Sequence, residues 1–186
     1  MVASNSARDV GADFAAGRAH SFGRRSILKK RLSAGKVRVK KVIGLAKVNR
    51  SARRLFVASV FTQKTFAHQI SGLFMSEVLN LRRQAANYSG IFQAGRCLTV
   101  SLAVAYGPRG DPHARILKEL FALYFKTVDW WLSNRSCDDL RSAWMCIKKC
   151  VLANNGIHRD KVSGILGNVI CTLAEIKWQP IAYNIL

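Results

Sequence analysis

The sequence predicts a mainly α-helical protein, in which a flexible, disordered basic arm (residues 1–35) precedes a compact helical domain (residues 36–186). In the second half of the chain, apolar residues recur at intervals of three and four, as they do on the buried face of a helix. Residue types that start and stop helices bracket these segments. The chain has 186 residues, of which 49% are apolar, and this is enough to bury a core. We therefore expect a bundle-like domain of about five helices joined by short loops.

The predicted arm is rich in Ala, Gly, Ser and Arg and has few large apolar side chains. Burial of so little apolar surface cannot offset the entropy that is lost on ordering the segment. The residues that follow it, KVRVKKVIG, alternate between basic and apolar side chains. A period of two would place Val37 and Val39 on one face of a short strand, although the start of a basic helix has a similar pattern.

The pattern turns helical at about Arg50. The apolar residues of LFVASVF form one side of this helix, and Arg50, Arg53 and Arg54 are expected on its outer side. The segment HQISG interrupts the pattern. A second helix then opens at Ser76, followed at once by Glu77, whose carboxylate stabilises the positive end of the helix dipole, and it runs to about Tyr88.

Residues 96–106 are apolar and lead into the loop GPRGDP, which cannot continue a helix. Asp111 is expected to cap the next helix and Pro112 to occupy its first position. This helix has the most regular apolar spacing in the chain. A further helix starts at Ser136 and stops at an Asn-Asn-Gly sequence, and the last helix spans roughly residues 161–177.

The distribution of charge indicates the partner. The formal net charge is +20, and fifteen of the thirty Lys and Arg residues lie between Asp13 and Glu77, where there is no acidic residue. Such a block repels itself unless an anionic partner compensates it. RNA or DNA would do so, because cations on one surface release the counterions that are condensed on phosphates; the alternative is a solvated basic face without a fixed partner. The predicted phosphate contacts are Lys36, Arg38, Lys40, Lys41, Lys47, Arg50, Arg53, Arg54, Arg82 and Arg83.

No catalytic residue, metal site or cofactor is predicted. Paired aspartates hold metal ions in polymerases and nucleases, but Asp138 and Asp139 follow Ser136 at a predicted helix start, where carboxylates stabilise the dipole. Cys146 and Cys150 lie one turn apart on one helix, yet no further ligands have the spacing of a zinc site, so both are expected to be buried free thiols. The four histidines have no nucleophile motif near them.

Two further features have a functional and a structural interpretation. Trp130, Trp131 and Trp144 could stack on bases, but at helical spacing among Leu and Ile they are expected in the core. The loop GPRGDP lacks the GxxxxGK[ST] pattern of a phosphate-binding loop and is read as a turn with a helix cap. The helix start beside Arg109 stays a minor candidate for an anion site.

The cysteines and the absence of targeting patterns bear on localisation. Five cysteines without a CxxC pair do not form a disulfide framework, so a reducing intracellular compartment, nuclear or cytoplasmic, is expected. The sequence has no apolar run of membrane-spanning length and no secretory signal, and no membrane partner is expected. The Arg- and Ser-containing segment SFGRRSILKKRLS has features of an organelle transit peptide, which makes a mitochondrial location the alternative. The oligomeric state is not indicated.

The segment RRLFVASVFTQKTFAHQISGLFMSEVLNLRR resembles the region that follows the polymerase core in LINE-like (non-LTR) retrotransposon reverse transcriptases of the protist and dinoflagellate type. The similarity continues through AGRCLTVSLAVAYGPRGDPHARI and VSGILGNVICTLAEIKWQPIAYNIL, and it covers about residues 30–186 in colinear order. At two positions the chain departs from the family, because Ile165 replaces a usual proline and Lys177 a usual glycine.

The resemblance implies a thumb-like or connection-like helical region that grips the backbone of a template–primer. The family's fingers and palm would lie upstream, and its [FY]xDD strand has no counterpart here, so the chain is expected to be non-catalytic as it stands. A protein of a different class, a basic structural protein of an organellar ribonucleoprotein particle, is the alternative.

Overall fold

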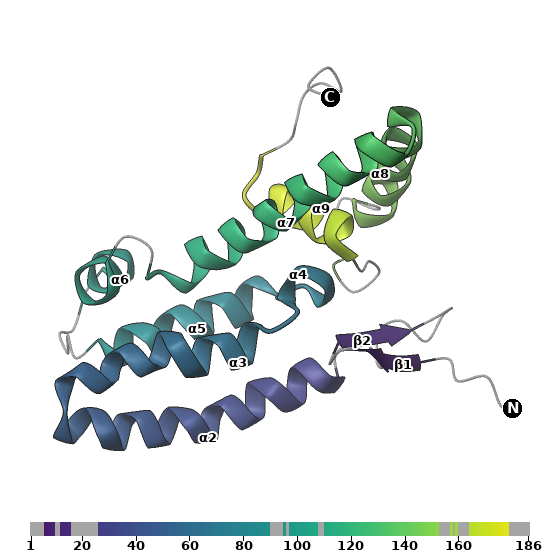
Figure 1. Ribbon diagram of the computed structural model, residues 1–186. Helices are drawn as coiled ribbons and strands as arrows, with labels where there is room; N and C mark the ends of the chain where they lie inside the picture. Colours follow the sequence, from purple (N-terminus) through teal and green to yellow (C-terminus); the bar gives the residue numbers. More distant parts are fainter. Residues whose placement is uncertain are drawn as a thin grey trace, which may run out of the picture.

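The fold is mainly helical, as the sequence predicts, but it has more than the five helices expected (Figure 1). The structure is a computed structural model that describes residues 6–9, 12–15, 26–89, 95, 97–107, 110–152, 157, 159 and 164–178. Its elements are β1 (Ser6–Asp9), β2 (Ala12–Ala15), α2 (Ser26–Val48), η2 (Arg50–Arg54), η3 (Phe56–Phe61), α3 (Thr62–Thr65), α4 (His68–Ser71), α5 (Met75–Tyr88), α6 (Leu98–Tyr106), α7 (Pro112–Asn134), α8 (Cys137–Val151) and α9 (Gly164–Glu175).

Helix α2 corrects two expectations. It is a continuous helix of 23 residues, so the predicted boundary between residues 35 and 36 is wrong, and the segment KVRVKKVIG is helical and not a strand. Among the side chains of α2 that the structure describes, Leu28, Gly35 and Val42 are buried, and their spacing of seven places them on one face. Val37 is 58% exposed on the other side of the helix. The alternation of valines therefore does not mark the buried face.

Part of the predicted arm is also ordered. Strands β1 and β2 pair antiparallel, with Ser6 opposite Ala15. The hairpin contacts the start of α2 and α4, and Figure 1 shows it beside that end of the helix. Backbone pairing does not require the large apolar side chains that this segment lacks. The remaining residues of the predicted arm lie outside the described residues.

The helix expected from Arg50 is irregular. It begins as the 3₁₀ segment η2, capped by the side chain of Asn49, and continues as the π-helical segment η3 before the single turn of α3. The hydroxyls of Ser59 and Thr62 donate to the carbonyls of Leu55 and Ala58, at 2.7 and 2.9 Å. Such bonds compete with the α-helical ladder, which fits the widened turn.

The later helices begin at or close to the predicted residues, although α5 starts at Met75 with Phe74 as its N-cap and not at Ser76. The Glu77 carboxylate accepts a bond from the backbone N–H of Phe74 at 2.8 Å and so caps α5. Asp111 caps α7, with Pro112 in its first turn, and Ser136 caps α8. Asp138 and Asp139 lie in the first turn of α8, as expected. Helix α9 lies within the range predicted for the last helix, whereas the Asn-Asn-Gly stop lies outside the described residues.

The buried apolar residues that the structure describes form several clusters along the length of the molecule. One part joins α2, η3, α5 and α6, where the rings of Phe56 and Tyr88 stack at 4.9 Å between centroids. A second joins α2, η3, α5 and α7 through Leu28, Phe61 and Ile116, among others. The other parts lie between α7, α8 and α9. In Figure 1, α2 therefore lies along one edge of the molecule, with α3 and α5 between it and α7.

Lys64 is a buried cation that packs against α2. Its side chain is 2% exposed, and its ammonium group donates to the Gln84 side-chain oxygen on α5 at 2.6 Å. The aliphatic part of Lys64 lies where a Cβ at Gly35 would be, because an added Cβ would clash with Lys64 Cε. Glycine at this position thus allows α2 to approach Lys64. Burial, and then the charge of Lys36, lower the pKa of Lys64.

This lowered pKa predicts a pH dependence of stability. Between the lowered value and the ordinary value of 10.5, the unfolded chain binds more protons at Lys64 than the folded chain does. The free energy of unfolding should therefore rise with pH across this window. The substitution Lys64→Met should reduce that rise, and Lys118→Met, at an exposed lysine of α7, should preserve it. Chemical denaturation at several alkaline pH values measures both slopes, and equal slopes for the two variants would contradict this interpretation.

Candidate nucleic-acid interface

The exposed side of α2 carries five of the ten predicted phosphate contacts. Lys36, Arg38, Lys40, Lys41 and Lys47 are all exposed, and so are Lys29 and Lys30. The helix has no acidic residue. Among the side chains that the structure describes, no ion pair involves a residue of α2. These cations are therefore available to an anion from outside the chain.

Four of these residues form a line, which we call the lysine stripe: Lys29, Lys36, Lys40 and Lys47. They are separated by seven, four and seven residues, and at about 100° per residue this spacing keeps them on one flank of the helix. With a rise of about 1.5 Å per residue, the stripe is about 27 Å long. A nucleic-acid duplex carries about one phosphate charge per 1.7 Å of its axis, so the stripe can lie along several phosphates at once.

The other exposed cations of α2 lie away from the stripe. Lys30 and Lys41 project from the side opposite the buried face, and Arg38 lies on the second flank, since helical periodicity separates them from Lys36 and Lys40. An extended anion that crosses the solvent side of α2 can thus contact cations on both flanks.

The arginines of η2 are not equivalent. Arg54 is exposed, as predicted. Arg53 is half-buried, and its guanidinium donates to the carbonyl of Ser89 at 2.9 Å. Ser89 is the C-cap of α5, so this cation stabilises the negative end of that helix dipole. The expectation that Arg53 faces outward is corrected accordingly. The side chain of Arg50 lies outside the described residues.

Arg82 is engaged inside the molecule. Its Nε and Nη2 donate to both carboxylate oxygens of Asp111, the shortest distance being 2.7 Å, and the two side chains are only 15% and 16% exposed. Nη2 also donates to the Thr99 hydroxyl at 2.8 Å. Because Asp111 itself caps α7 through the N–H of His113, one guanidinium links α5, α6 and the start of α7. Arg82 is therefore structural, and its neighbour Arg83 is the exposed cation of the pair.

Exchange of these two arginines for alanine separates the structural role from the surface role. Arg82→Ala leaves the half-buried Asp111 without its charged partner and should reduce the free energy of unfolding by about 2 kcal/mol. Arg83→Ala should change it by less than about 0.5 kcal/mol, because Arg83 is exposed. Thermal or urea denaturation gives both values. Equal stability of the two variants would show that the Arg82–Asp111 contact contributes little.

Three of the residues considered for metal binding or base stacking, Cys146, Cys150 and Trp130, do not lie as expected. Cys146 and Cys150 are exposed, so the prediction of buried thiols is wrong for both. The described residues contain no group of three or more His, Cys, Asp or Glu side chains that could hold a metal ion. Trp130 is 57% exposed, against the prediction of a core position, whereas Trp144 packs between α7, α8 and α9. Helix periodicity alone does not distinguish these environments.

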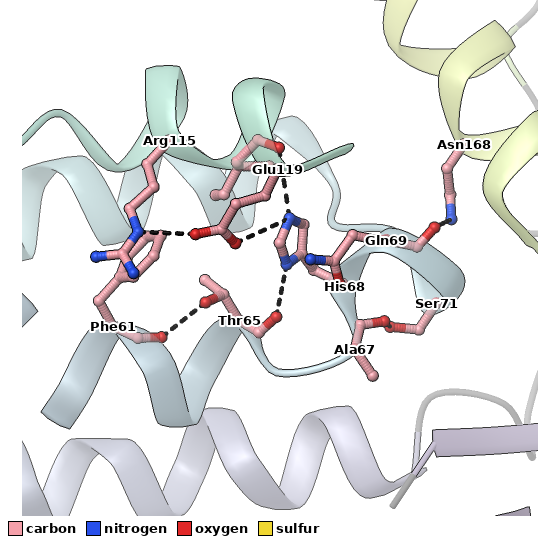
Figure 2. A network of polar contacts seen from close by, with 10 residues as sticks. Phe61, Thr65, Ala67, His68, Gln69, Ser71, Arg115, Glu119 and Asn168 are labelled. Carbon is pink, nitrogen blue, oxygen red and sulfur yellow. Dashed lines mark hydrogen bonds and ion pairs between the residues drawn. The ribbon is translucent and has the colours of Figure 1, made fainter. Parts of the chain in front are cut away.

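A buried polar network, shown in Figure 2, connects α3, α4 and α7 around His68. His68 is 3% exposed, and its Nδ1–H donates to the Thr65 carbonyl at 2.7 Å. Its Nε2 lies 3.4 Å from the Ile116 carbonyl and 3.9 Å from the Glu119 carboxylate. Glu119 in turn accepts a bond from Arg115 at 2.8 Å. Both ring nitrogens of His68 face acceptor atoms of the protein, so His68 links α3, α4 and α7.

Asn168 extends the same junction to α9. Its Nδ2 donates to the carbonyls of Gln69 and Ile70, each at 2.8 Å. Arg159 and Glu175 form an ion pair at 2.7 Å beside it, and a small cavity lies among these side chains. Burial, and then the charge of Arg82, lower the pKa of His113 at the edge of this cavity. The polar groups are thus used to hold α4 against α9.

Comparison of the chain with models of protein families, with curated proteins and with solved structures finds no match. None of the described helices combines the length and the apolar character that crossing a membrane requires. The exposed, acid-free face of α2 is the feature that bears most directly on function.

Proposed function

We propose that this chain is a non-catalytic, nucleic-acid-binding region of a retroelement reverse transcriptase, which holds the phosphate backbone of RNA or DNA against the exposed side of α2. The observation that carries the proposal is the lysine stripe. It is a linear array of exposed cations on a continuous helix, without a described acidic partner.

A linear array suits an extended polyanion. A small anion needs donors that converge in a pocket, whereas the lysines of the stripe are spread over a length of about 27 Å. Lysine contributes a point charge and makes no fixed bidentate contact, which favours attraction to phosphates without readout of base sequence. The helix does not depend on the partner for its position, because Leu28 and Val42 anchor it to the core.

The resemblance to LINE-like reverse transcriptases supplies the type of polyanion, a template–primer. A helical region with a basic edge would support the primer–template backbone beside a polymerase core. The alternative, a structural protein of an organellar ribonucleoprotein particle, makes the same electrostatic contacts with another RNA. An upstream reading frame for a palm domain supports the first candidate, and co-sedimentation with ribosomes supports the second.

The compartment follows from the same proposal. Cys97, Cys137, Cys146 and Cys150 are free thiols in the structure, which suits the reducing environment of the nucleus or cytoplasm. The alternative ribonucleoprotein function would place the chain in mitochondria.

The salt dependence of binding tests the electrostatic contacts. The double substitution Lys36→Gln and Lys40→Gln removes two stripe charges, and it should weaken binding to every oligonucleotide sequence to a similar extent. The slope of log K against log salt concentration should become smaller by about 0.9 per lysine for a duplex and about 0.7 for a single strand. Fluorescence anisotropy at several salt concentrations measures these slopes.

The matched control is Lys118→Gln with Lys126→Gln, which removes the same charge from exposed positions of α7. If the control reduces affinity and slope as much as the stripe variant, net charge and not the stripe governs binding. Vesicles with and without anionic lipid serve as a second comparison. Binding to anionic vesicles without binding to oligonucleotides would contradict the proposal.

A further inference from the structure

Phe66 is an exposed aromatic residue beside α2, on the flank of the helix that carries Arg31 and Arg38. It lies in the turn between α3 and α4, and it is 49% exposed although its neighbours Thr65 and His68 are buried. Exposure of a phenylalanine ring is unfavourable in water unless a partner covers it. No cavity or packing requirement of the described core explains its outward position, since Phe66 is not part of any core cluster.

Arg31 of α2 fixes the orientation of this ring. The guanidinium carbon lies over the ring, 4.4 Å from its centroid, in a cation–π contact. The same side chain donates from Nη1 to the Phe66 carbonyl at 3.2 Å. The two contacts hold the guanidinium over the ring, while about half of Phe66 stays exposed to solvent.

The turn that carries Phe66 is strained and firmly held. Ala67 has φ 59°, in the left-handed region that is unfavourable for a residue with a Cβ. The Ala67 carbonyl accepts bonds from the backbone N–H of Ile70 and Ser71 and from the Ser71 hydroxyl. Figure 2 shows the Ser71 bond and, on the other side of the turn, the bond between His68 and Thr65. These bonds keep the turn in a conformation that points Phe66 away from the core.

The surroundings of the stack are cationic. Arg38 is exposed two turns further along the same flank of α2, and Lys30 is exposed on the solvent side of the helix, whereas the lysine stripe lies on the other flank. Aromatic rings and arginine planes beside a track of cations are the elements with which proteins bind unpaired nucleotides: the cations contact the backbone, and the bases stack on the rings.

We propose that Phe66 and Arg31 form a stacking platform for an unpaired base, so that the region binds single-stranded nucleic acid or a single-stranded overhang through Phe66 as well as through phosphate contacts. This inference rests on the proposed function, and it names the substrate class of the same surface. Stacking on Phe66 adds affinity only where a base is unpaired and can unstack from the adjacent bases of its strand. Phe66 should therefore distinguish single strands from blunt duplexes, which the lysines alone do not.

The test compares the full chain and its variants on a single-stranded oligonucleotide and on a blunt duplex of the same sequence. Phe66→Leu keeps an apolar side chain but removes the aromatic face, and Phe66→Tyr keeps that face. Phe66→Leu should weaken single-strand binding by about tenfold, as expected for the loss of one stacked base, and should change duplex binding less than about twofold. Phe66→Tyr should bind both as the parent chain does. A 2-aminopurine base in the single strand should be quenched by the parent chain and less by Phe66→Leu.

The control is Phe125→Leu, at a phenylalanine of α7 that is 64% exposed and belongs to another surface. It should leave both affinities unchanged. If Phe66→Leu weakens neither substrate, or weakens both equally, the stacking platform is wrong while the lysine contacts stand. If the parent chain binds neither substrate, the proposed function fails together with the platform. Circular dichroism melting of each variant establishes that the fold is retained.

Discussion

The position of α2 depends on one narrow contact face. Leu28, Gly35 and Val42 recur every seven residues and are the buried ones among the described side chains of the helix. Leu28 and Val42 join two different parts of the core. Between them, Gly35 lies against the buried side chain of Lys64, where a Cβ has no room. Because burial is confined to this face, the remaining circumference of a 23-residue helix is left to solvent. The exposed cations follow from this mode of anchoring.

The distribution of ion pairs adds to the effect. Asp111, Glu119 and Glu175 are each paired with an arginine, Arg82, Arg115 and Arg159 respectively, and all three pairs lie in the region of α5, α7 and α9. Arginine suits such sites because its planar guanidinium makes several directed bonds to a carboxylate. The lysines of α2 have no such partner among the described side chains. The fold therefore separates charges that stabilise it from charges that can bind a polyanion.

Several parts of this arrangement could be predicted from the sequence and others could not. Local signals were sufficient for the starts of α7 and α8, because Asp111, Pro112 and Ser136 act on the backbone within a few residues. Local signals did not predict the buried face of α2, because this face includes a glycine, Gly35, while the apolar Val37 is exposed. They failed also for Arg82, since its partner Asp111 is 29 residues away and nothing local distinguishes Arg82 from Arg83. The contact between Arg31 and Phe66 could not be predicted for the same reason, because the two residues lie 35 positions apart in the sequence.

The most direct measurement of the central claim is the reactivity of individual lysines toward an amine-acylating reagent, read by mass spectrometry with and without a bound oligonucleotide. If α2 is the binding surface, Lys36 and Lys40 should be protected by the oligonucleotide at low salt and become reactive again at high salt. Lys118 and Lys126 on α7 should react equally in both samples. Equal protection of all four lysines, or protection confined to α7, would contradict the account.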